Sequence, residues 1–301
     1  MSGELKEVRQ RIGGTRQIRR VTSTLQRVAA ARLRQDRLAI ESAGRYRARL
    51  GDVLGAIALA APGVAHPLSC PRGGGRVCVV IFGADRGLCG GFTTGLMDEL
   101  ERLKERQPPE GVCVVAVGKV AQRRARRAGW RVEYGFRQPS TSRLGARAAR
   151  AAGAEAEGIA EVRRVTDLVS AGFLKGTFCA VHILYARFLS SLRQRPTVEL
   201  LLPVTLPAPA APAMRGAELE PAAEALLARL LPEYVFCSML DAFYNSLGSE
   251  DAARQLAMSR ATENAGALLD GLVMSYRRLR QDSITNEMIE LCGARLEERR
   301  N

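Results

Sequence analysis

Aromatic residues and long apolar runs are scarce in this sequence, and each scarcity excludes a class of protein. Aromatic residues make up 5% of the chain, with a single tryptophan, Trp130. A protein that binds single-stranded nucleic acid by stacking bases needs more rings than this. No run of about 18 apolar residues occurs, so we expect no membrane-spanning helix. The N-terminal segment has no apolar core of the secretory type, and we expect the chain to stay in the cytosol or on its face of a membrane.

Histidine and paired cysteines are equally poorly represented. The two histidines, His66 and His182, stand far apart, and no two of the seven cysteines are spaced as C-x-x-C. This spacing argues against a zinc site and against a thioredoxin-like redox motif. The common nucleophile and metalloprotease motifs are also absent from the sequence. We therefore expect no catalytic residue, no bound metal and no cofactor on this chain.

What the sequence has in excess is positive charge. It contains 45 Lys and Arg against 31 Asp and Glu, a formal net charge of +14, within a composition that is 47% hydrophobic and 25% charged. The composition is typical of a core-forming protein. The charge indicates an anionic partner, whether a polyanion, an acidic protein surface or a membrane headgroup region. The most basic segment, Gly118 to Gly129, could dock on phosphates, but solvated surface is the favoured interpretation.

Hydrophobic periodicity predicts a long helix at each end of the chain. The first runs from Glu4 to about Leu59, and the second from Pro221 to about Arg300. An unbroken helix over the first stretch would be about 80 Å long and needs a partner helix. Each helix has a narrow apolar stripe, so the two can bury each other in an antiparallel coiled coil. The stripes consist of Leu5, Val8, Ile12, Ile18, Val21, Leu25 and Val28 in the first helix, and of Leu268, Leu272, Tyr276, Leu279, Ile284, Met288 and Leu291 in the second.

Between the helices, shorter apolar runs predict an α/β domain. Strands are expected at 77–82, 112–118, 130–136, 178–184 and 198–204, and helices at 94–106, 120–128 and 146–172. The predicted fold is α/β, an antiparallel coiled coil of long N- and C-terminal helices with an inserted Rossmann-like α/β domain whose sheet is largely parallel. We expect the coiled-coil shaft at 1–61 with 213–301, the α/β lobe at 76–206, and linkers at 62–75 and 207–212.

A glycine-rich segment, GADRGLCGGF from Gly83 to Phe92, follows a predicted strand and opens a helix. Phosphates bind at such positions in many α/β proteins, but the segment lacks the Lys-Ser/Thr pair of a P-loop and the G-x-G-x-x-G of a dinucleotide loop. We interpret it as a tight strand-to-helix turn and leave nucleotide binding as the less favoured alternative. The turn is predicted to need its glycines, Gly83, Gly87, Gly90 and Gly91.

Four segments resemble the gamma-subunit family of the F-type ATP synthase, the central rotor shaft. They are Leu5 to Gln35, the turn ADRGLCGGF from Ala84 to Phe92, Leu184 to Val204 with LYARF and LLLPV, and Leu247 to Ala294 with SEDAARQLAM and RQDSITNE. Together they span nearly the whole chain in the family's order. The resemblance implies a non-catalytic subunit that couples ion translocation through the membrane rotor c ring to ATP synthesis or hydrolysis in a ring of alpha and beta subunits. It also implies the epsilon subunit as a partner, no nucleic acid, and a peripheral position on the cytoplasmic face of a bacterial plasma membrane.

The same resemblance implies roles for individual residues. Matching positions place Arg254, Gln281, Thr285 and Glu287 against loops of the beta subunits, and Glu220 on the side of the rotor ring and epsilon. For Gln281, Thr285 and Glu287 the alternative is plain exposed helix surface.

The sequence also departs from the family's pattern. Different residues occur at Ser23, Leu25, Ala186 and Arg277, and one residue is missing between Glu290 and Gly293. A deletion in a helix turns all that follows by about 100°, so the contacts beyond Glu290 are not carried over. These departures are compatible with a divergent or second copy of the synthase.

Two other functional classes compete with this interpretation. One is an Arg-rich coiled-coil protein that associates with nucleic acid or acts as a scaffold, and the other is an α/β enzyme that uses the turn at 83–91. Neither accounts for both terminal helices.

Overall fold

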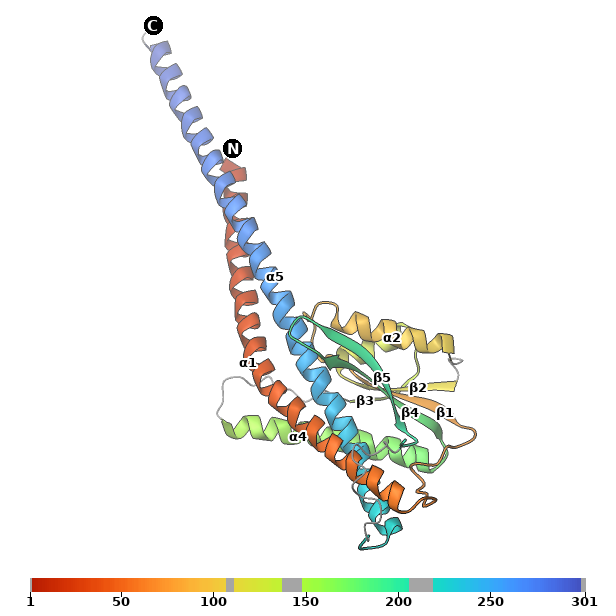
Figure 1. Cartoon of the computed structure of the whole chain (residues 1–301). Coiled ribbons are helices and arrows are strands. Elements are labelled where there is room, and N and C mark those ends of the chain that lie inside the picture. Colours follow the sequence, from red (N-terminus) through yellow and green to blue (C-terminus); the bar gives the residue numbers. More distant parts are fainter. Residues whose placement is uncertain (1, 107–110, 137–147, 206–218, 299–301) are drawn as a thin grey trace. The chain divides into compact units, whose positions relative to one another are not determined.

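A computed structural model describes residues 2–106, 111–136, 148–205 and 219–298, and shows long terminal helices with an α/β domain inserted between them (Figure 1). The elements, in chain order, are α1 (Ser2–Ala60), β1 (Arg76–Phe82), α2 (Phe92–Arg106), β2 (Val112–Val117), α3 (Lys119–Arg127), β3 (Val132–Phe136), α4 (Ala148–Leu174), β4 (Phe178–Phe188), β5 (Gln194–Leu202) and α5 (Ala223–Glu298). The predicted fold class is confirmed. None of the helices within the described residues is long and apolar enough to cross a membrane.

The chain divides into two compact units. Residues 29–254 form one, which we call the sheet unit, and residues 1–28 with 255–301 form the other, the end unit. The boundaries fall inside α1 and α5, so part of each long helix belongs to each unit. The predicted division into a shaft at 1–61 with 213–301, a lobe at 76–206 and linkers at 62–75 and 207–212 follows whole helices instead, and it stays a prediction.

The five strands of the sheet unit form one mixed sheet in the order β3-β2-β1-β4-β5. β1 pairs in parallel with β2 and β4, and β2 pairs in parallel with β3, as expected of strands joined through helices. β5 is antiparallel to β4. β4 and β5 differ from their predicted bounds of 178–184 and 198–204, because the residues flanking their connection are polar and give no apolar run. A hairpin with one face exposed to solvent can form without a continuous apolar run, because its outward-facing residues can be polar.

Helices cover both faces of this sheet. On one face, alternate residues of β1 such as Cys78 and Val80 pack with residues of α1, α4 and α5, among them Leu54 and Phe173. On the other face, Val79 and Ile81 pack with residues of α2, including Leu96. β1 and β2 are therefore buried on both sides, which explains their continuous apolar sequences.

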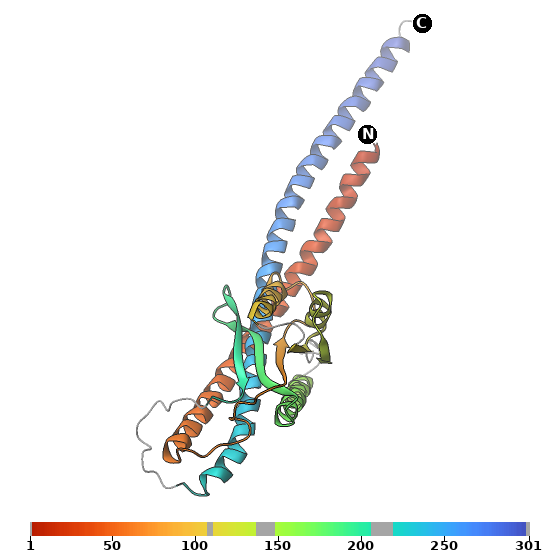
Figure 2. The ribbon, with the colours of Figure 1, turned by 90° about the vertical axis from the view of Figure 1, so that its right-hand side faces the viewer.

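In the end unit, α1 and α5 pack along a seam that includes most of the predicted α1 stripe: Ile12 is buried, and Leu5, Val8, Leu25 and Val28 are half-buried (Figure 2). Ile12, Thr15 and Thr22 are the buried residues of α1 here, whereas Ile18 and Val21 are exposed. The buried positions follow spacings of three and seven, as in a coiled coil. Thr22 was not recognised because it is polar; its Oγ1 lies 2.8 Å from Thr262 Oγ1 on α5.

The predicted stripe of α5 is correct only in part. Leu272, Tyr276 and Leu279 are half-buried. Its other members are exposed: Leu268, Ile284, Met288 and Leu291. The end unit thus carries apolar side chains that α1 does not cover.

Candidate functional site

A helix occupies the place where doubly wound sheets bind their ligands. That place lies outside the carboxyl ends of the strands, where the connections leave in opposite directions. Here it falls between β1, whose connection runs through α2 to β2, and β4 on its other side. From α5, Ser246 Oγ donates a 2.6 Å hydrogen bond to the carbonyl of Phe82 in β1, and Ser249 Oγ donates one of 2.9 Å to the carbonyl of Ala186 in β4. Both serines are buried, so side chains of α5 cap strand carbonyls in the position of a bound ligand.

The glycine-rich turn beside this crossing is used for packing. At Gly83, an added Cβ would lie 2.5 Å from the Cβ of Ala121 in α3, and Gly90 has a positive φ of 55°. Gly87 and Gly91 have neither a positive φ nor an atom within 4 Å of an added Cβ, so the structure shows no need for glycine there. Gly118 was not among the glycines predicted to be required, yet its φ is 104° and its added Cβ would lie 2.3 Å from the carbonyl oxygen of Gly83.

Polar groups of the same turn hold the start of α3. The backbone N–H of Lys119 donates to Asp85 Oδ1 at 3.2 Å, and that of Val120 donates to the carbonyl of Ala84 at 3.0 Å. Gly118, at the N-cap of α3, has no side chain to do this. The turn therefore places acceptor oxygens on the N–H groups at the start of α3, which are the donors that a phosphate-binding helix N-terminus would direct at its ligand.

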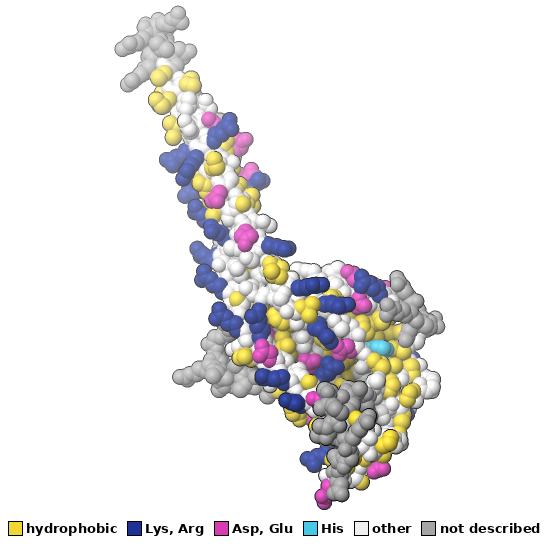
Figure 3. Space-filling model, viewed as in Figure 1, with side chains coloured by type: hydrophobic (Ala, Val, Ile, Leu, Met, Phe, Trp, Pro, Cys, Tyr) yellow, Lys and Arg dark blue, Asp and Glu magenta, His cyan; other side chains and the backbone are white. Residues whose placement is uncertain are grey.

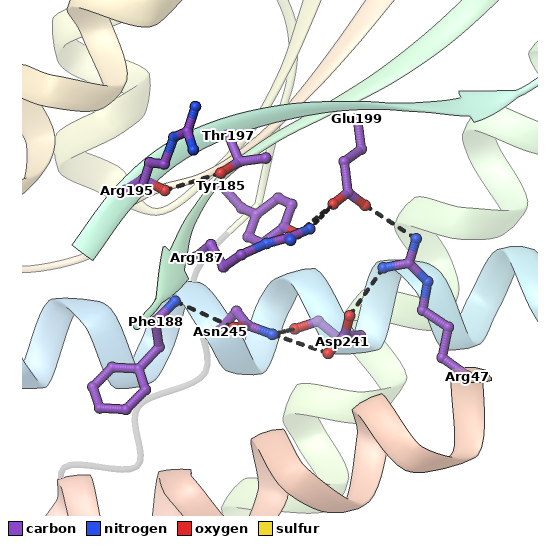
Figure 4. Close-up of polar contacts among 9 residues, drawn as sticks. All are labelled: Arg47, Tyr185, Arg187, Phe188, Arg195, Thr197, Glu199, Asp241 and Asn245. Carbon is purple, nitrogen blue, oxygen red and sulfur yellow. Dashed lines mark hydrogen bonds and ion pairs between the residues drawn. The ribbon is translucent and has the colours of Figure 1, made fainter. Parts of the chain in front are cut away.

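A partly buried ion-pair network joins α1, β5 and α5 (Figure 4). Arg47 on α1 donates from Nη2 to Glu199 Oε2 on β5 and from Nη1 to Asp241 Oδ2 on α5, both at 3.0 Å. Asn245 donates to Asp241 Oδ1 at 2.9 Å and accepts from the backbone N–H of Phe188 at 3.2 Å. One guanidinium thus fixes two helices and the edge strand of the sheet.

Burial and charge compete within this network. Burial would raise the pKa of Glu199, but the hydrogen bond from Tyr185 at 2.8 Å and the charge of Arg47 outweigh it and hold that pKa below its usual value. Tyr185 is affected in the opposite sense, because burial and the neighbouring Glu199 carboxylate raise its pKa to about 12. Burial also raises the pKa of Asp241, against the charge of Arg47. Arg47 therefore compensates both carboxylates, and Arg187 supplies a second positive charge to Glu199.

Arg254 lies in a buried part of α5. Its side chain is 11% exposed, and its guanidinium is held by Glu250 and Asp251 one turn earlier on the same helix. The structure thus brings Arg254 together with acidic residues of its own chain, and the contact with beta-subunit loops stays a prediction.

The other residues singled out from the sequence are exposed. Gln281, Thr285 and Glu287 lie on α5 in the end unit, where Thr285 Oγ1 donates to the carbonyl of Gln281 at 3.0 Å and Ser283 Oγ donates to Glu287 Oε1 at 3.2 Å. Glu220 is exposed just before α5.

A groove of about 630 Å³ lies beside these residues in the end unit. Apolar side chains of α1 and α5 line it together with three arginines and a glutamate: Leu5, Ile12, Val273, Tyr276, Ile284, Arg9, Arg16, Arg280 and Glu287. Lys and Arg side chains are prominent along this part of the surface (Figure 3). The groove is therefore partly apolar and positively charged, and Glu287 is the member of the predicted contact set that lines it.

These features define a class of protein. A pair of long helices carries an α/β sheet, one of those helices fills the usual ligand position of the sheet, and the polar clusters join elements to one another. This is the arrangement of a mechanical or structural subunit of a larger assembly.

Comparisons with known proteins identify the assembly. The sequence profile of the ATP synthase family matches residues 4–295. The ATP synthase gamma chains of Desulforamulus reducens and Desulforudis audaxviator are each 32% identical to this chain; the first alignment covers 96% of both chains, and the second covers 96% of this chain and 97% of the relative. The chain belongs to the ATP synthase gamma-chain family and is a central-stalk subunit of the F-type rotor, without a catalytic role of its own.

Solved structures share the fold at low sequence identity. A chain of the rotor of the Euglena gracilis mitochondrial ATP synthase superposes with a TM-score of 0.61 at 16% identity, covering 94% of this chain and all of that one. A chain from the Tetrahymena thermophila mitochondrial ATP synthase central stalk and c-ring structure gives 0.57 at 18% identity, over 80% of this chain and 99% of the other. Helical ends with an inserted α/β sheet are therefore common to these chains.

Proposed function

We propose that this chain turns inside a ring of alpha and beta subunits and couples ion translocation through a membrane rotor to ATP synthesis or hydrolysis. The observation that supports this best is the surface of α5 in the end unit, where large apolar side chains such as Met274, Ile284 and Met288 are exposed. Several large apolar side chains exposed along one helix are typical of an interaction site. A surrounding ring of subunits would cover it.

Gln281, Thr285 and Glu287 are the proposed contacts with the beta subunits. They are exposed, capable of hydrogen bonding, and lie within two turns of one helix. An asymmetric shaft that offers such groups to one catalytic subunit at a time would stabilise different conformations of identical sites, which is coupling by differential contact. Arg254 is the fourth proposed contact with the beta subunits, and in this chain its guanidinium is bound by Glu250 and Asp251.

The proposed partners are the alpha and beta subunits, the epsilon subunit and the membrane rotor c ring, with no nucleic acid. The Tetrahymena structure is described as a central stalk with its c-ring, which supports contact with a rotor ring. Glu220 would lie on that side, as would epsilon. The net charge of +14 fits acidic loops of the ring. We also propose a peripheral position on the cytoplasmic face of the membrane, and a shaft at 1–61 with 213–301 that carries a lobe at 76–206.

Assembly of a hydrolytic complex tests the proposal. The chain is mixed with alpha and beta subunits of the same organism, and ATP turnover of the purified complex is measured. Replacing Gln281 and Thr285 together by Ala should lower turnover by about tenfold, the effect of roughly 1.4 kcal/mol of lost coupling. Ser275→Ala is the matched control, since Ser275 is exposed and hydrogen-bonds to the carbonyl four residues before it, as Thr285 does.

The alternative functions predict different results. Binding to DNA or RNA that weakens with salt, together with no association with alpha and beta subunits, would favour the nucleic-acid alternative. Saturable nucleotide binding by the isolated chain would favour the enzyme.

A further inference from the structure

A cluster of charged side chains is buried between α1 and α5 inside the sheet unit. Asp36 of α1 is 8% exposed, and Asp251 and Glu250 of α5 are also buried. Arg32 of α1 and Arg254 of α5 supply the positive charges. Of these residues, Arg254 alone has a role in the function proposed above.

The ion pairs of the cluster, among the described residues, involve the acidic residues of α5 and not Asp36 of α1. Arg254 is held by Glu250 and Asp251 on its own helix, and Asp36 has no such ion pair among the described contacts. One carboxyl oxygen of Asp36, Oδ2, is buried without a hydrogen-bond partner in the described part of the chain. The carboxyl of Asp36 instead makes a hydrogen-bond contact with that of Asp251. Two carboxyl groups can share a hydrogen bond only if one of them carries the proton.

The proton belongs on Asp36. Burial raises its pKa to about 8, the charge of Asp251 adds to this, and the nearby charge of Arg32 opposes it. Burial raises the pKa of Asp251 too, but Arg254 and Arg32 lie close enough to oppose that rise. Asp251 is therefore the ionised acceptor and Asp36 the neutral donor.

The surroundings leave little freedom for a rearrangement. Gly248 of α5 faces α1 so closely that an added Cβ would lie 2.8 Å from Ile40 Cδ1 and 3.4 Å from Asp36 Cβ. Besides Glu250, Asp251 and the two arginines, charged groups act on this cluster from the β1–α2 loop, where Arg86 affects Arg32 and the Cys89 thiol lies near Arg254. An ionised Asp36 would face Asp251 and Glu250 with only Arg32 nearby to compensate it.

We propose that the proton shared by Asp36 and Asp251 is a clasp that joins α1 to α5 in the sheet unit, and that its loss in alkaline solution separates the two helices at this level. Below a pH of about 8 Asp36 is neutral and the clasp is closed. The free carboxyl in the unfolded chain ionises near its ordinary pKa of 3.8, so the unfolded state binds fewer protons between these values. The contribution of this pair to folding stability therefore falls as pH rises through that interval.

The test compares thermal unfolding of the full chain, between pH 6 and 9.5, for the wild type, Asp36→Asn and Asp52→Asn. The amide introduced by Asp36→Asn can donate to Asp251 at any pH, so the unfolding temperature of this variant should fall with pH less steeply than that of the wild type. Asp52 is an exposed residue of the same helix, and its variant should follow the wild-type slope. Equal slopes for the wild type and Asp36→Asn would overturn the proposal.

Amide hydrogen exchange of the wild type provides the second measurement, which does not depend on how the Asp36→Asn variant folds. After correction for the intrinsic rate, protection of residues 32–40 and 247–254 should decrease between pH 6.5 and 9, while protection of the strand β2 is retained. Unchanged protection around Asp36 across this range would contradict the opening of the clasp. Neither readout depends on assembly with other subunits, so failure here is distinguishable from failure of the proposed function.

Discussion

Arg47 shows how one residue can hold distant parts of this chain together. Its guanidinium joins β5 to α5 through Glu199 and Asp241, which lie far along the sequence from it. Both acceptors are largely removed from water; Asp241 pairs with Arg47 alone among the ion pairs of the described residues, whereas Glu199 also pairs with Arg187. Removing Arg47 would therefore leave partly buried carboxylates without one of their compensating charges, and this is the main way in which the contact affects stability.

Replacing Arg47 by Ala should destabilise the protein. Breaking a fully buried ion pair costs about 3–5 kcal/mol, and since the side chain of Arg47 is 26% exposed we expect about 2 kcal/mol. Urea unfolding followed by circular dichroism measures the change. Arg49→Ala removes an exposed arginine from the same helix and should have little effect. Similar losses in the two variants would mean that the helix, and not the ion pairs, responds to the substitution.

At the scale of elements, the joint between β2 and α3 depends on a close backbone approach. Gly118 combines a positive φ with an added-Cβ distance of 2.3 Å to the Gly83 carbonyl, whereas Gly129 at the other end of α3 has a φ of 81° and open space around it. A substitution at Gly129 would introduce only conformational strain, whereas one at Gly118 would introduce the same strain and a steric overlap. Comparing the two positions therefore separates the two effects.

Gly118→Ala should therefore cost more stability than Gly129→Ala. Left-handed backbone costs a non-glycine residue about 1–2 kcal/mol, which is the loss expected at position 129. At position 118 the backbone must also move away from Gly83, and we expect about 3 kcal/mol or more. Chemical unfolding of both variants provides the comparison. If position 118 is no more sensitive than position 129, the close approach to Gly83 has no energetic weight.

Elements were predictable from the sequence wherever burial sets the pattern. β1 and β2 are buried on both faces and have continuous apolar runs, and both long helices were found within a few residues of their ends. The hairpin of β4 and β5 was placed too short, because Arg187 and Arg195 lie in its exposed half. The α1 seam of the end unit was predicted in part: Ile18 and Val21 are exposed, and the buried Thr15 and Thr22 could not be predicted from apolar spacing because they are polar.

The site could be predicted less well than the fold. The exposed residues Gln281 and Thr285 came from family resemblance alone, and the ion pairs of Arg47 could not be found because periodicity carries no information about pairing between distant elements. One signal was present: Asp241 and Asn245 are spaced by one turn in an otherwise apolar stretch of α5, as buried polar partners would be.

At the scale of the whole molecule, charge is the dominant property. The chain carries a net charge of +14, and in the end unit exposed arginines such as Arg9, Arg16 and Arg20 follow α1. Exposed charges of this kind mainly raise the association rate with an oppositely charged partner, and dissolved salt weakens this effect by screening them.

Association with alpha and beta subunits should therefore slow as salt rises. Replacing Arg9, Arg16 and Arg20 by Gln should lower the association rate at low salt by about tenfold and flatten its dependence on salt. Stopped-flow fluorescence with a labelled chain measures both. Arg123, Arg126 and Arg127 on α3 provide a control set of the same charge in the sheet unit. An unchanged rate in the α1 variant would show that these arginines do not steer assembly.

The division into units also sets an order of events during synthesis. The sheet unit is one continuous stretch, residues 29–254, whereas the end unit combines residues 1–28 with residues 255–301. A ribosome adds about 5–20 residues per second, so the first helical turns of α1 wait on the order of 10–50 s before their partner on α5 has been made. During that interval the apolar residues of α1 that later pack on α5, such as Ile12, have no partner helix and stay exposed to water.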